Sequence, residues 1–575
     1  MLLSKKFIVV FLLVSFFSFI VYYTTYKPYL GCDDAYIYFV YAKNLAKGYG
    51  MVYNAGGERV EGFTSLSWML IISLLYIISS HFQVLLILLN IVLISWVLYR
   101  LVAFIDRYFV SRPVKWISFP SILFLLTLFI IKGYLDWTIF SLMETGYWSW
   151  LLLLISIFLI ELAAGEEKEK KQRIQFAVLL SLLVLARPES FLWGTVFLVL
   201  YGWILYLRGN TVSEILKKIS FPFILFVLTI AGLELFRLYY FGYPLPNTFY
   251  AKVSEDKLSN IKEGLIYIFK FIYVYPFYFL PIAISFIYAL VLIRNIIYEK
   301  KEMIAKDHYM VVLYVTILLI LTSLVVPIVN GGDHFSLFRL IQPVVPLFIF
   351  LLFNPVLINK FKSLIVSPSY TKWAGITGLI LVLPLIYLMN IPKYGVNVEK
   401  TPYKASLLND FSFAESYKQE SYLLNDFFNF TPRPSIGRIW AGGYAYGYEG
   451  ETVDLMGLNN TAMAHAQKIK VGLKNHASFD KQAFYKLHPD LLNGTIVKDT
   501  TGFEPEENKP DFEKGFEYGV FKGIYKDSEF IHTYTPVLIG AHNKPFFYFS
   551  YVRNNYIDSL RNHNMTVTIL ERKKK

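Results

Sequence analysis

Long apolar stretches alternate with short polar loops over the first two thirds of the chain. This pattern predicts membrane-spanning helices, because about 20 apolar residues cross a bilayer core of about 30 Å. The stretch 66–80 is shorter, about 22 Å as a helix, so we expect a juxtamembrane or re-entrant helix there. Eleven spans are expected, near residues 7–24, 84–105, 116–132, 146–164, 174–188, 191–207, 219–238, 276–296, 309–329, 338–356 and 373–390.

The polar loops differ in charge from one side of the predicted bundle to the other. Lys and Arg are abundant in the segments 1–6, 166–173, 208–218, 294–306 and 360–372. Short basic loops remain in the cytoplasm, so the other loops and the tail are expected outside. A cleavable signal peptide is the alternative for the first apolar stretch, but no small-residue cleavage site follows it.

The tail after the last expected span is mostly polar and long enough for a soluble domain. It contains strand-like pieces at 436–441 and 452–456 and a helix-like piece at 417–428. The sequence therefore predicts an α-helical polytopic membrane protein with a C-terminal extracytoplasmic α/β domain. The expected division is 1–390 for the membrane domain, with its first outer loop at 25–83, and 391–575 for the soluble domain.

Composition agrees with this class. The chain of 575 residues is 55% hydrophobic and 17% charged, with a formal net charge of +13. Such a charge can indicate a nucleic-acid partner, but here the basic residues lie mostly in short loops, where they determine topology. We expect no nucleic-acid binding. The single cysteine, Cys32, excludes an internal disulfide and a multi-cysteine zinc site.

The loop after the first span holds a cluster of charged residues, namely Asp33, Asp34, Glu58, Arg59 and Glu61. Charged groups beside lipid are costly and indicate a functional site. The two aspartates also precede a helical pattern at 35–47, so capping of that helix is an alternative role. Capping needs only one of them, and the other could act as a general base. The pattern at 35–47 is amphipathic, and we expect that helix to lie in the membrane interface.

Further polar residues lie on the same outer side. Solvated loop charges and helix-end cations are the simplest interpretation. The alternative is a site in which the arginines bind a lipid-borne phosphate through their planar forks. No Walker loop or dinucleotide fingerprint is present, which favours a lipid-linked donor over a nucleotide-linked one. The residues concerned are Glu144, Arg187, Glu189, Asn247, Lys252, Asp333, His334 and Arg339.

Several segments resemble the GT-C glycosyltransferases related to the actinobacterial terminal β-arabinofuranosyltransferases. The resemblance covers about residues 30–465. Its most specific parts are the first outer loop and the stretch containing LPNT. The segments are DDAYI, GYGMVYN and ERVEGFT within 33–64 with Trp68, then MET at 143–145, ARPE at 186–189, YYFGYPLPNTFYAK at 239–252, GDH at 332–334 with Arg339, and VDLMGLN at 453–459.

The resemblance implies an inverting transferase that moves a sugar from a polyprenyl-phosphate donor to a cell-envelope glycan or lipid acceptor, in a bacterial plasma membrane. It implies Asp33 or Asp34 as the catalytic base, with the leading Asp33 favoured. It also implies that the other polar residues named above line the donor and acceptor cavity. Leu142 stands where relatives often have Gly, which could alter the fit of the sugar, and the tail after Asn460 no longer matches clearly.

Two other function classes fit part of the pattern. A transporter or flippase of lipid-linked glycans would also have many spans, but transporters usually place charges near the midplane and have repeated halves. A membrane scaffold would leave the outer carboxylates without a role. A divalent cation is a possible cofactor, although one His beside one Asp is weak evidence for a metal site. The expected partners are a polyprenyl-phosphate sugar and a glycan or glycolipid acceptor.

Overall fold

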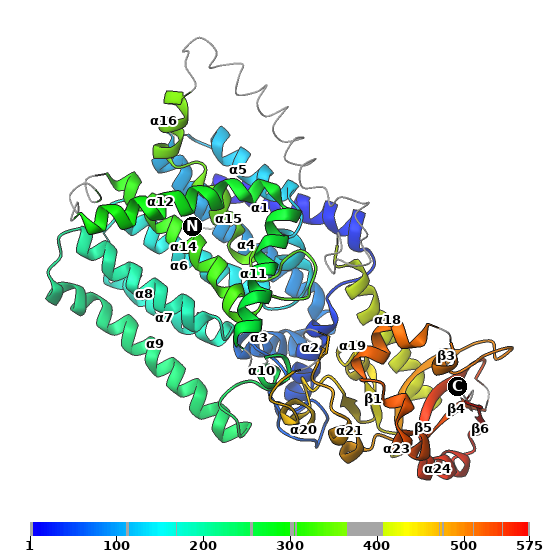
Figure 1. Cartoon of the computed structure of the whole chain (residues 1–575). Coiled ribbons are helices and arrows are strands. Elements are labelled where there is room, and N and C mark those ends of the chain that lie inside the picture. Colours follow the sequence, from blue (N-terminus) through cyan, green and yellow to red (C-terminus); the bar gives the residue numbers. More distant parts are fainter. Residues whose placement is uncertain are drawn as a thin grey trace.

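The structure is a computed structural model that describes residues 4–110, 114–167, 169–253, 257–298, 304, 307–364, 406–470, 472–473, 476–509, 511–542 and 544–572. Figure 1 shows two parts, a large body of helices and a smaller domain built around a sheet. The helical body comes from residues up to 364, and the sheet domain from 406 onwards. The expected span at 373–390 and the expected boundary at 390 and 391 lie outside the described residues.

The helical body begins with the apolar helix α1 and ends with α16. Its helices are α1 Lys5–Val21, α2 Asp33–Ala46, α3 Leu66–Ile78, α4 Phe82–Phe104, α5 Phe119–Ile130, α6 Thr145–Ala163, α7 Lys170–Ala186, α8 Ser190–Leu207, α9 Val212–Tyr240, α10 Asn247–Lys252, α11 Lys257–Val274, α12 Phe279–Ile297, α14 His308–Asn330, α15 Val345–Leu351 and α16 Pro355–Leu364.

Within the described ranges, seven helices are long and apolar enough to cross a membrane. The chain is therefore a multi-pass membrane protein by length and composition, while the expected number of eleven spans is not confirmed. Two further expected spans form the shorter helices α5 and α7, and the one at 338–356 contains the short apolar helix Gln342–Leu351. The seven are Lys5–Tyr26, Phe82–Phe109, Thr145–Ala163, Ser190–Leu207, Val212–Tyr240, Pro276–Ile297 and His308–Asn330.

Local sequence explains where several of these helices start and stop. Thr211 and Glu214 form a capping box at the start of α9, each side chain accepting a hydrogen bond from the backbone N–H of the other residue. Gly331 ends α14 with φ +78°, a left-handed conformation that glycine adopts without a steric penalty. Helix α3 has 13 residues, too few for a span, in agreement with the sequence prediction for this segment.

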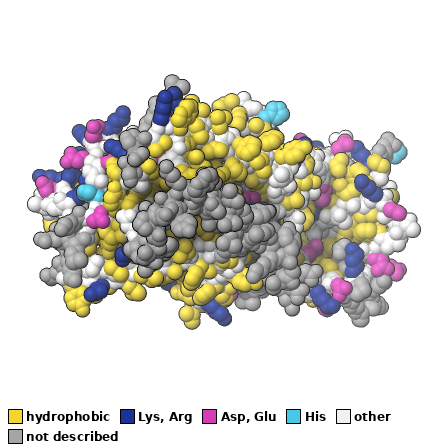
Figure 2. All heavy atoms as spheres, turned by 90° about the horizontal axis from the view of Figure 1, so that it is seen from above, with side chains coloured by type: hydrophobic (Ala, Val, Ile, Leu, Met, Phe, Trp, Pro, Cys, Tyr) yellow, Lys and Arg dark blue, Asp and Glu magenta, His cyan; other side chains and the backbone are white. Residues whose placement is uncertain are grey.

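Two of the basic segments of the helical body lie away from the sheet domain. The turns that join α6 to α7 and α8 to α9 lie at the left of Figure 1, and they contain the basic segments 166–173 and 208–218. Figure 2 shows hydrophobic side chains over much of the visible described surface between this end and the sheet domain. This separation agrees with a lipid-facing belt. The orientation in the membrane stays a prediction.

The C-terminal domain contains a six-stranded mixed sheet of order β2-β1-β3-β5-β4-β6. Strands β2, β1 and β3 are parallel, and the other pairs are antiparallel. The predicted α/β class is confirmed, with strands shorter than expected at 436–441 and 452–456. The strands are β1 Ile436–Arg438, β2 Thr452–Asp454, β3 Leu491–Val497, β4 Tyr534–Gly540, β5 Phe547–Arg553 and β6 Thr566–Ile569.

Apolar side chains of the sheet alternate between two cores. On β4, Val537 and Ile539 belong to one core and Leu538 to the other, as expected for a strand whose successive side chains point to opposite faces. Helices cover both faces, so the domain has three layers. Its helices are α18 Leu408–Phe427, α19 Gly442–Gly447, α20 Thr461–His465, α21 Lys481–Leu487, α22 Phe516–Val520, α23 Ser528–Thr533 and α24 Ile557–Asn562.

Helix α2 packs between the helical body and the sheet domain, next to α3 and α19 (Figure 1). All residues from Ala35 to Ala42 are buried. The prediction that this helix lies in the membrane interface is therefore wrong. The sheet domain covers the polar side of the helix. Lys43, for example, donates a hydrogen bond of 2.6 Å to the carbonyl of Tyr446 and lies over its ring.

Candidate active site

The two aspartates at the start of α2 have different partners. The Asp33 carboxylate accepts hydrogen bonds from the backbone N–H groups of Gly442 (3.0 Å) and Gly443 (2.8 Å), at the start of α19. The Asp34 carboxylate lies 3.5 Å from the Lys252 ammonium. Asp33 therefore holds the sheet domain against helix α2, whereas Asp34 is directed to the cations of the helical body.

Glycine is required where Asp33 meets the sheet domain. A Cβ atom on Gly442 would lie 1.9 Å from the backbone oxygen of Asp33, and a Cβ on Gly443 would lie 2.1 Å from the backbone oxygen of Ala414. Neither backbone oxygen can move alone, because each belongs to a packed helix. The two glycines thus allow a close backbone approach between the domain and α2.

The surroundings also shift the pKa values of the two carboxyl groups in opposite directions. Burial raises the pKa of Asp33 to about 6, against the lowering effect of its two backbone hydrogen bonds. Burial would also raise the pKa of Asp34, but Lys252, Arg339 and His334 outweigh it and hold that pKa below its ordinary value. Asp34 is therefore ionised at neutral pH and able to accept a proton.

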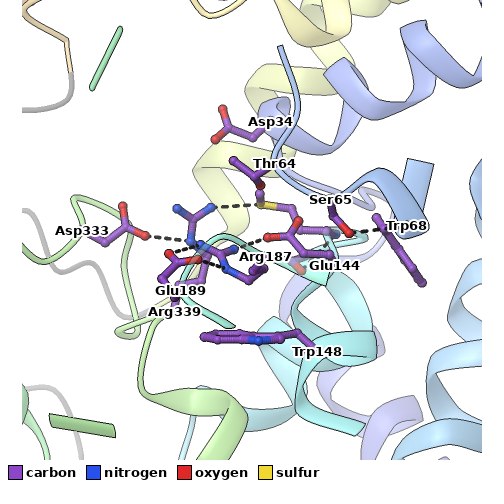
Figure 3. Close-up of polar contacts among 12 residues, drawn as sticks. Asp34, Thr64, Ser65, Trp68, Glu144, Trp148, Arg187, Glu189, Asp333 and Arg339 are labelled. Atoms are coloured by element: carbon purple, nitrogen blue, oxygen red, sulfur yellow. Dashed lines mark hydrogen bonds and ion pairs between the residues drawn. The ribbon is translucent and has the colours of Figure 1, made fainter. Parts of the chain in front are cut away.

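Two arginines lie below Asp34, and each is held by buried carboxylates (Figure 3). Arg187 is bound by Glu144 and, at 2.8 and 3.0 Å, by Glu189, and it lies over the Trp148 ring. These acidic partners raise the pKa of Arg187, although burial alone would lower it. The Glu144 side chain is fully buried behind Arg187, and this ion pair compensates its buried charge.

Arg339, the second of the two arginines, is held by its own set of partners. Its Nε donates to Asp333 at 2.7 Å, and Nη1 lies 3.3 Å from the sulfur of Met143. The guanidinium also lies over the Phe335 ring, 4.5 Å from its centroid. Burial would raise the pKa of Asp333, but Arg339 and His334 lower it well below its usual range. Arg339 is thus a fixed positive charge next to Asp34.

Two cavities meet at the charged residues around Asp34. The helix-bundle cavity, of about 1030 Å³, lies among α8, α10, α11 and α14 and includes Arg187, Glu189 and Arg339 in its wall. The interdomain cavity, of about 570 Å³, lies between the helical body and the sheet domain and includes Asp33 and His334. Both volumes are typical of ligand sites. The residues that line both cavities are Asp34, Ile37, Lys252, Asp333 and Leu458.

Three of the predicted site residues instead join distant segments of the chain, one within the helical body and two between the helical body and the sheet domain. Glu61 pairs with Arg237 through two contacts of 2.9 and 3.2 Å, and burial raises the pKa of this glutamate to about 7. Glu58 accepts a hydrogen bond from the backbone of Thr461, and Asn247 donates to the backbone of the same segment of the sheet domain.

Five predicted residues lie outside the walls of both cavities. The structure does not place them in the lining of either cavity, and their role in substrate binding stays a prediction. Charge and sequence position alone do not distinguish a cavity wall from a domain contact. These residues are Glu58, Arg59, Glu61, Glu144 and Asn247. Arg59 lies over the Tyr240 ring, and Glu144 is behind Arg187.

The hydrogen bonds of Asn247 predict that this residue contributes measurably to docking of the sheet domain. Its amide nitrogen donates to the carbonyls of Gly457, Leu458 and Asn460 at 2.7, 3.0 and 3.3 Å. Asn247→Ala leaves these buried carbonyls without this donor, which costs about 1–3 kcal/mol per unsatisfied group. We expect a lower unfolding temperature in detergent and faster proteolytic release of the C-terminal domain. Wild-type values in both measurements would contradict this role.

Leu142 lies in a backbone turn of unusual conformation. Its φ is +57°, in the left-handed region that favours glycine. The turn places Glu144 at the start of α6, and the Leu142 carbonyl accepts a hydrogen bond of 3.1 Å from the Trp68 indole. The leucine side chain is buried and lies outside both cavities. A direct effect on sugar fit is not supported.

Sequence reasoning missed the aromatic wall of the interdomain cavity. Phe413, Trp440 and Phe516 come from three separate parts of the tail, and His476 lies beside them. The glycine-rich segment that follows Trp440 was visible in the sequence, but the surrounding rings have no common spacing. Within the described ranges, no group of three or more His, Cys, Asp or Glu residues could hold a metal ion. The possible divalent cation stays a prediction.

Comparison with known proteins gives only distant likeness. No family model and no curated protein matches the chain. Among solved structures, it is similar to the Archaeoglobus fulgidus oligosaccharyltransferase AglB in complex with an inhibitory peptide and a dolichol-phosphate, with 9% identity and a TM-score of 0.45 over 96% of this chain and 74% of that one.

The apo form of the Archaeoglobus fulgidus oligosaccharyltransferase gives 10% identity and a TM-score of 0.47, over 96% of this chain and 75% of that one. The form tethered to an acceptor peptide with the NVT sequon gives 10% and 0.47, over 96% and 74%. Likeness at this level does not establish function. The functional argument rests on the residues around the two cavities.

Proposed function

We propose that the chain is an integral membrane glycosyltransferase of the GT-C kind. It transfers a sugar from a polyprenyl-phosphate donor to a cell-envelope glycan or lipid acceptor, with inversion at the anomeric carbon. We place it in a bacterial plasma membrane, with its active site and sheet domain outside the cytoplasm. The observation that carries the proposal is the position of Asp34, at the junction of two cavities and next to Lys252.

The helix-bundle cavity suits a lipid-linked donor. Its wall includes the partly exposed apolar side chains Leu192, Phe249 and Val329, from helices α8, α10 and α14. A polyprenyl chain can lie against such apolar surface. Lys252 and Arg339 in the same wall can bind the phosphate, since ammonium and guanidinium groups form charge-assisted hydrogen bonds with phosphate oxygens.

The proposed reaction is a single displacement. The acceptor hydroxyl gives its proton to Asp34, and its oxygen forms the new bond to the anomeric carbon of the sugar. The bond between that carbon and the phosphate oxygen breaks, and the polyprenyl phosphate leaves with the electron pair. Lys252 and Arg339 stabilise the charge on the leaving phosphate. Asp33 holds the sheet domain in place and does not take the proton.

Donor binding also makes Asp34 a stronger base. In the free protein, Lys252, Arg339 and His334 lower the pKa of Asp34. A donor phosphate bound to Lys252 and Arg339 offsets their positive charge, so the pKa of Asp34 rises when the donor is present. The proton affinity of Asp34 is thereby coupled to the presence of the donor. This coupling favours proton transfer, because a general base is most effective when its pKa lies near the working pH.

Lys252→Met tests this coupling through the pH dependence of the rate. Asp34 must be ionised to accept a proton, and its lowered pKa keeps it ionised as the pH falls below neutrality. Without Lys252 that pKa rises, so the acidic limb of kcat/KM should move to higher pH. The control is Lys262→Met, an exposed residue outside both cavities. An unmoved acidic limb in Lys252→Met would contradict the coupling.

The proposed function is tested with purified protein in lipid nanodiscs. Polyprenyl-phosphate sugars are supplied with glycan acceptors, and release of polyprenyl phosphate is measured together with the new glycosidic linkage. In parallel, surface glycans are analysed in cells that lack the protein and are complemented with wild type. Formation of one linkage and its loss in the cells support the proposal. Movement of intact lipid-linked glycan across the membrane without linkage formation would instead indicate a transporter.

A further inference from the structure

The interdomain cavity has an aromatic wall that the proposed reaction does not use. Phe413 from α18 lies 6.4 Å from Trp440, with ring planes at 22°, and Trp440 lies 5.6 Å from Phe516 of α22, at 17°. All three line the cavity, and Phe413 and Phe516 are 48% and 42% exposed. Exposed apolar surface in a concave site is typical of ligand binding. We call these three residues the aromatic wall.

The chemistry around the aromatic wall fits a saccharide. The faces of aromatic rings carry partial negative charge, which attracts the C–H groups on one face of a sugar ring. The Asp410 carboxylate and the Lys270 ammonium lie in the wall of the same cavity and can bind sugar hydroxyls. A ligand with an apolar face and a polar rim therefore matches both kinds of surface.

The sheet does not offer this cavity a free edge for an extended peptide. Peptides often bind by adding a strand to an exposed sheet edge. Strand β2 is the edge strand nearest α2, but Asn54 pairs with both backbone groups of Thr452, accepting from its N–H at 3.1 Å and donating to its carbonyl at 3.0 Å. The observations thus favour a glycan over a peptide.

We propose that the aromatic wall binds the non-reacting sugar units of an oligosaccharide acceptor, while the terminal hydroxyl reaches Asp34 at the other end of the same cavity. The sheet domain then determines the acceptor class and its minimum length. This inference rests on the proposed function, because it assigns the acceptor for the same site.

Trp440→Ala and Phe516→Ala test the inference in the nanodisc assay. The probes are defined glucan, mannan, arabinan and N-acetylglucosamine oligomers of increasing length, and a peptide with an Asn-X-Thr sequon. We expect the wild-type KM for the acceptor to fall as the oligomer lengthens. Each variant should raise it by about tenfold, the loss expected for one ring contact, with an unchanged KM for the donor.

Matched variants separate binding from folding. Trp440→Phe keeps an aromatic face and should recover most of the acceptor affinity. Tyr422→Ala removes a side chain that is 46% exposed on the same helix as Phe413 but outside the cavity, and it should leave the acceptor KM at the wild-type value. Phe413→Ala provides a third variant of the aromatic wall if one of the others fails to fold.

The outcomes distinguish this inference from the proposed function. Sugar transfer by wild type to the peptide and to no oligosaccharide would overturn the inference and leave glycosyl transfer intact. Equal acceptor KM values in Trp440→Ala, Phe516→Ala and Tyr422→Ala would also overturn it. Absence of polyprenyl phosphate release with every acceptor would overturn the proposed function itself.

Discussion

Asp34→Asn is expected to reduce sugar transfer by about 10²–10⁴-fold, the usual cost of removing a general base. The asparagine keeps the shape of the side chain but cannot accept the proton of the acceptor hydroxyl. The measurement is the rate of linkage formation at saturating donor and acceptor. Binding of the polyprenyl-phosphate donor should persist, because Lys252 and Arg339 remain in place.

Asp33→Asn is the matched control for Asp34→Asn. The N–H groups of Gly442 and Gly443 bind different oxygens of Asp33, and the asparagine keeps an acceptor for one of them, so a mild loss of activity is expected. This assignment reverses the preference for Asp33 that the resemblance implied. An inactive Asp33→Asn together with a nearly wild-type Asp34→Asn would return the role of base to Asp33.

Gly442→Ala is expected to lower the transfer rate by about 10²-fold while the protein still inserts into the membrane. The added Cβ would lie 1.9 Å from the Asp33 backbone oxygen, so α2 and α19 must move apart. A displacement of about 1 Å at a catalytic group can cost this much. The measurements are the transfer rate and the thermal unfolding of the purified variant in detergent.

Gly232→Ala is the control for the glycine substitution. Gly232 lies in α9, and a Cβ at this position meets no atom within 4 Å. We expect wild-type activity and the same or slightly higher stability, since alanine favours helix more than glycine does. Wild-type activity in Gly442→Ala would show that contact between Asp33 and the sheet domain does not position Asp34.

Periodic features of the fold could be predicted from the sequence because each depends on neighbouring residues. Within the part of the chain that the structure describes, the apolar stretches form seven helices long enough to span a membrane, and the polar tail forms an α/β domain. The short apolar stretch at 66–80 forms α3, as expected from its length. Composition over 10–20 residues is sufficient for such predictions.

The candidate site was predicted only in part. Asp34, Lys252, Asp333 and Arg339 were selected from outer loops, and the structure brings them together around the junction of the two cavities. Glu61 was selected by the same reasoning, yet it pairs with Arg237 of α9. Nothing in the first outer loop distinguishes a glutamate that faces a cavity from one that faces an arginine 176 positions later.

The sequence by itself determined the class of protein, because hydrophobic length and loop charge act locally. Tertiary structure alone decided which aspartate faces the cavities, because the partners of Asp33 are two backbone N–H groups about 400 positions away. It also decided that Phe413, Trp440 and Phe516 form one wall. Contacts between distant segments depend on how the whole chain packs, and a local pattern carries no information about them.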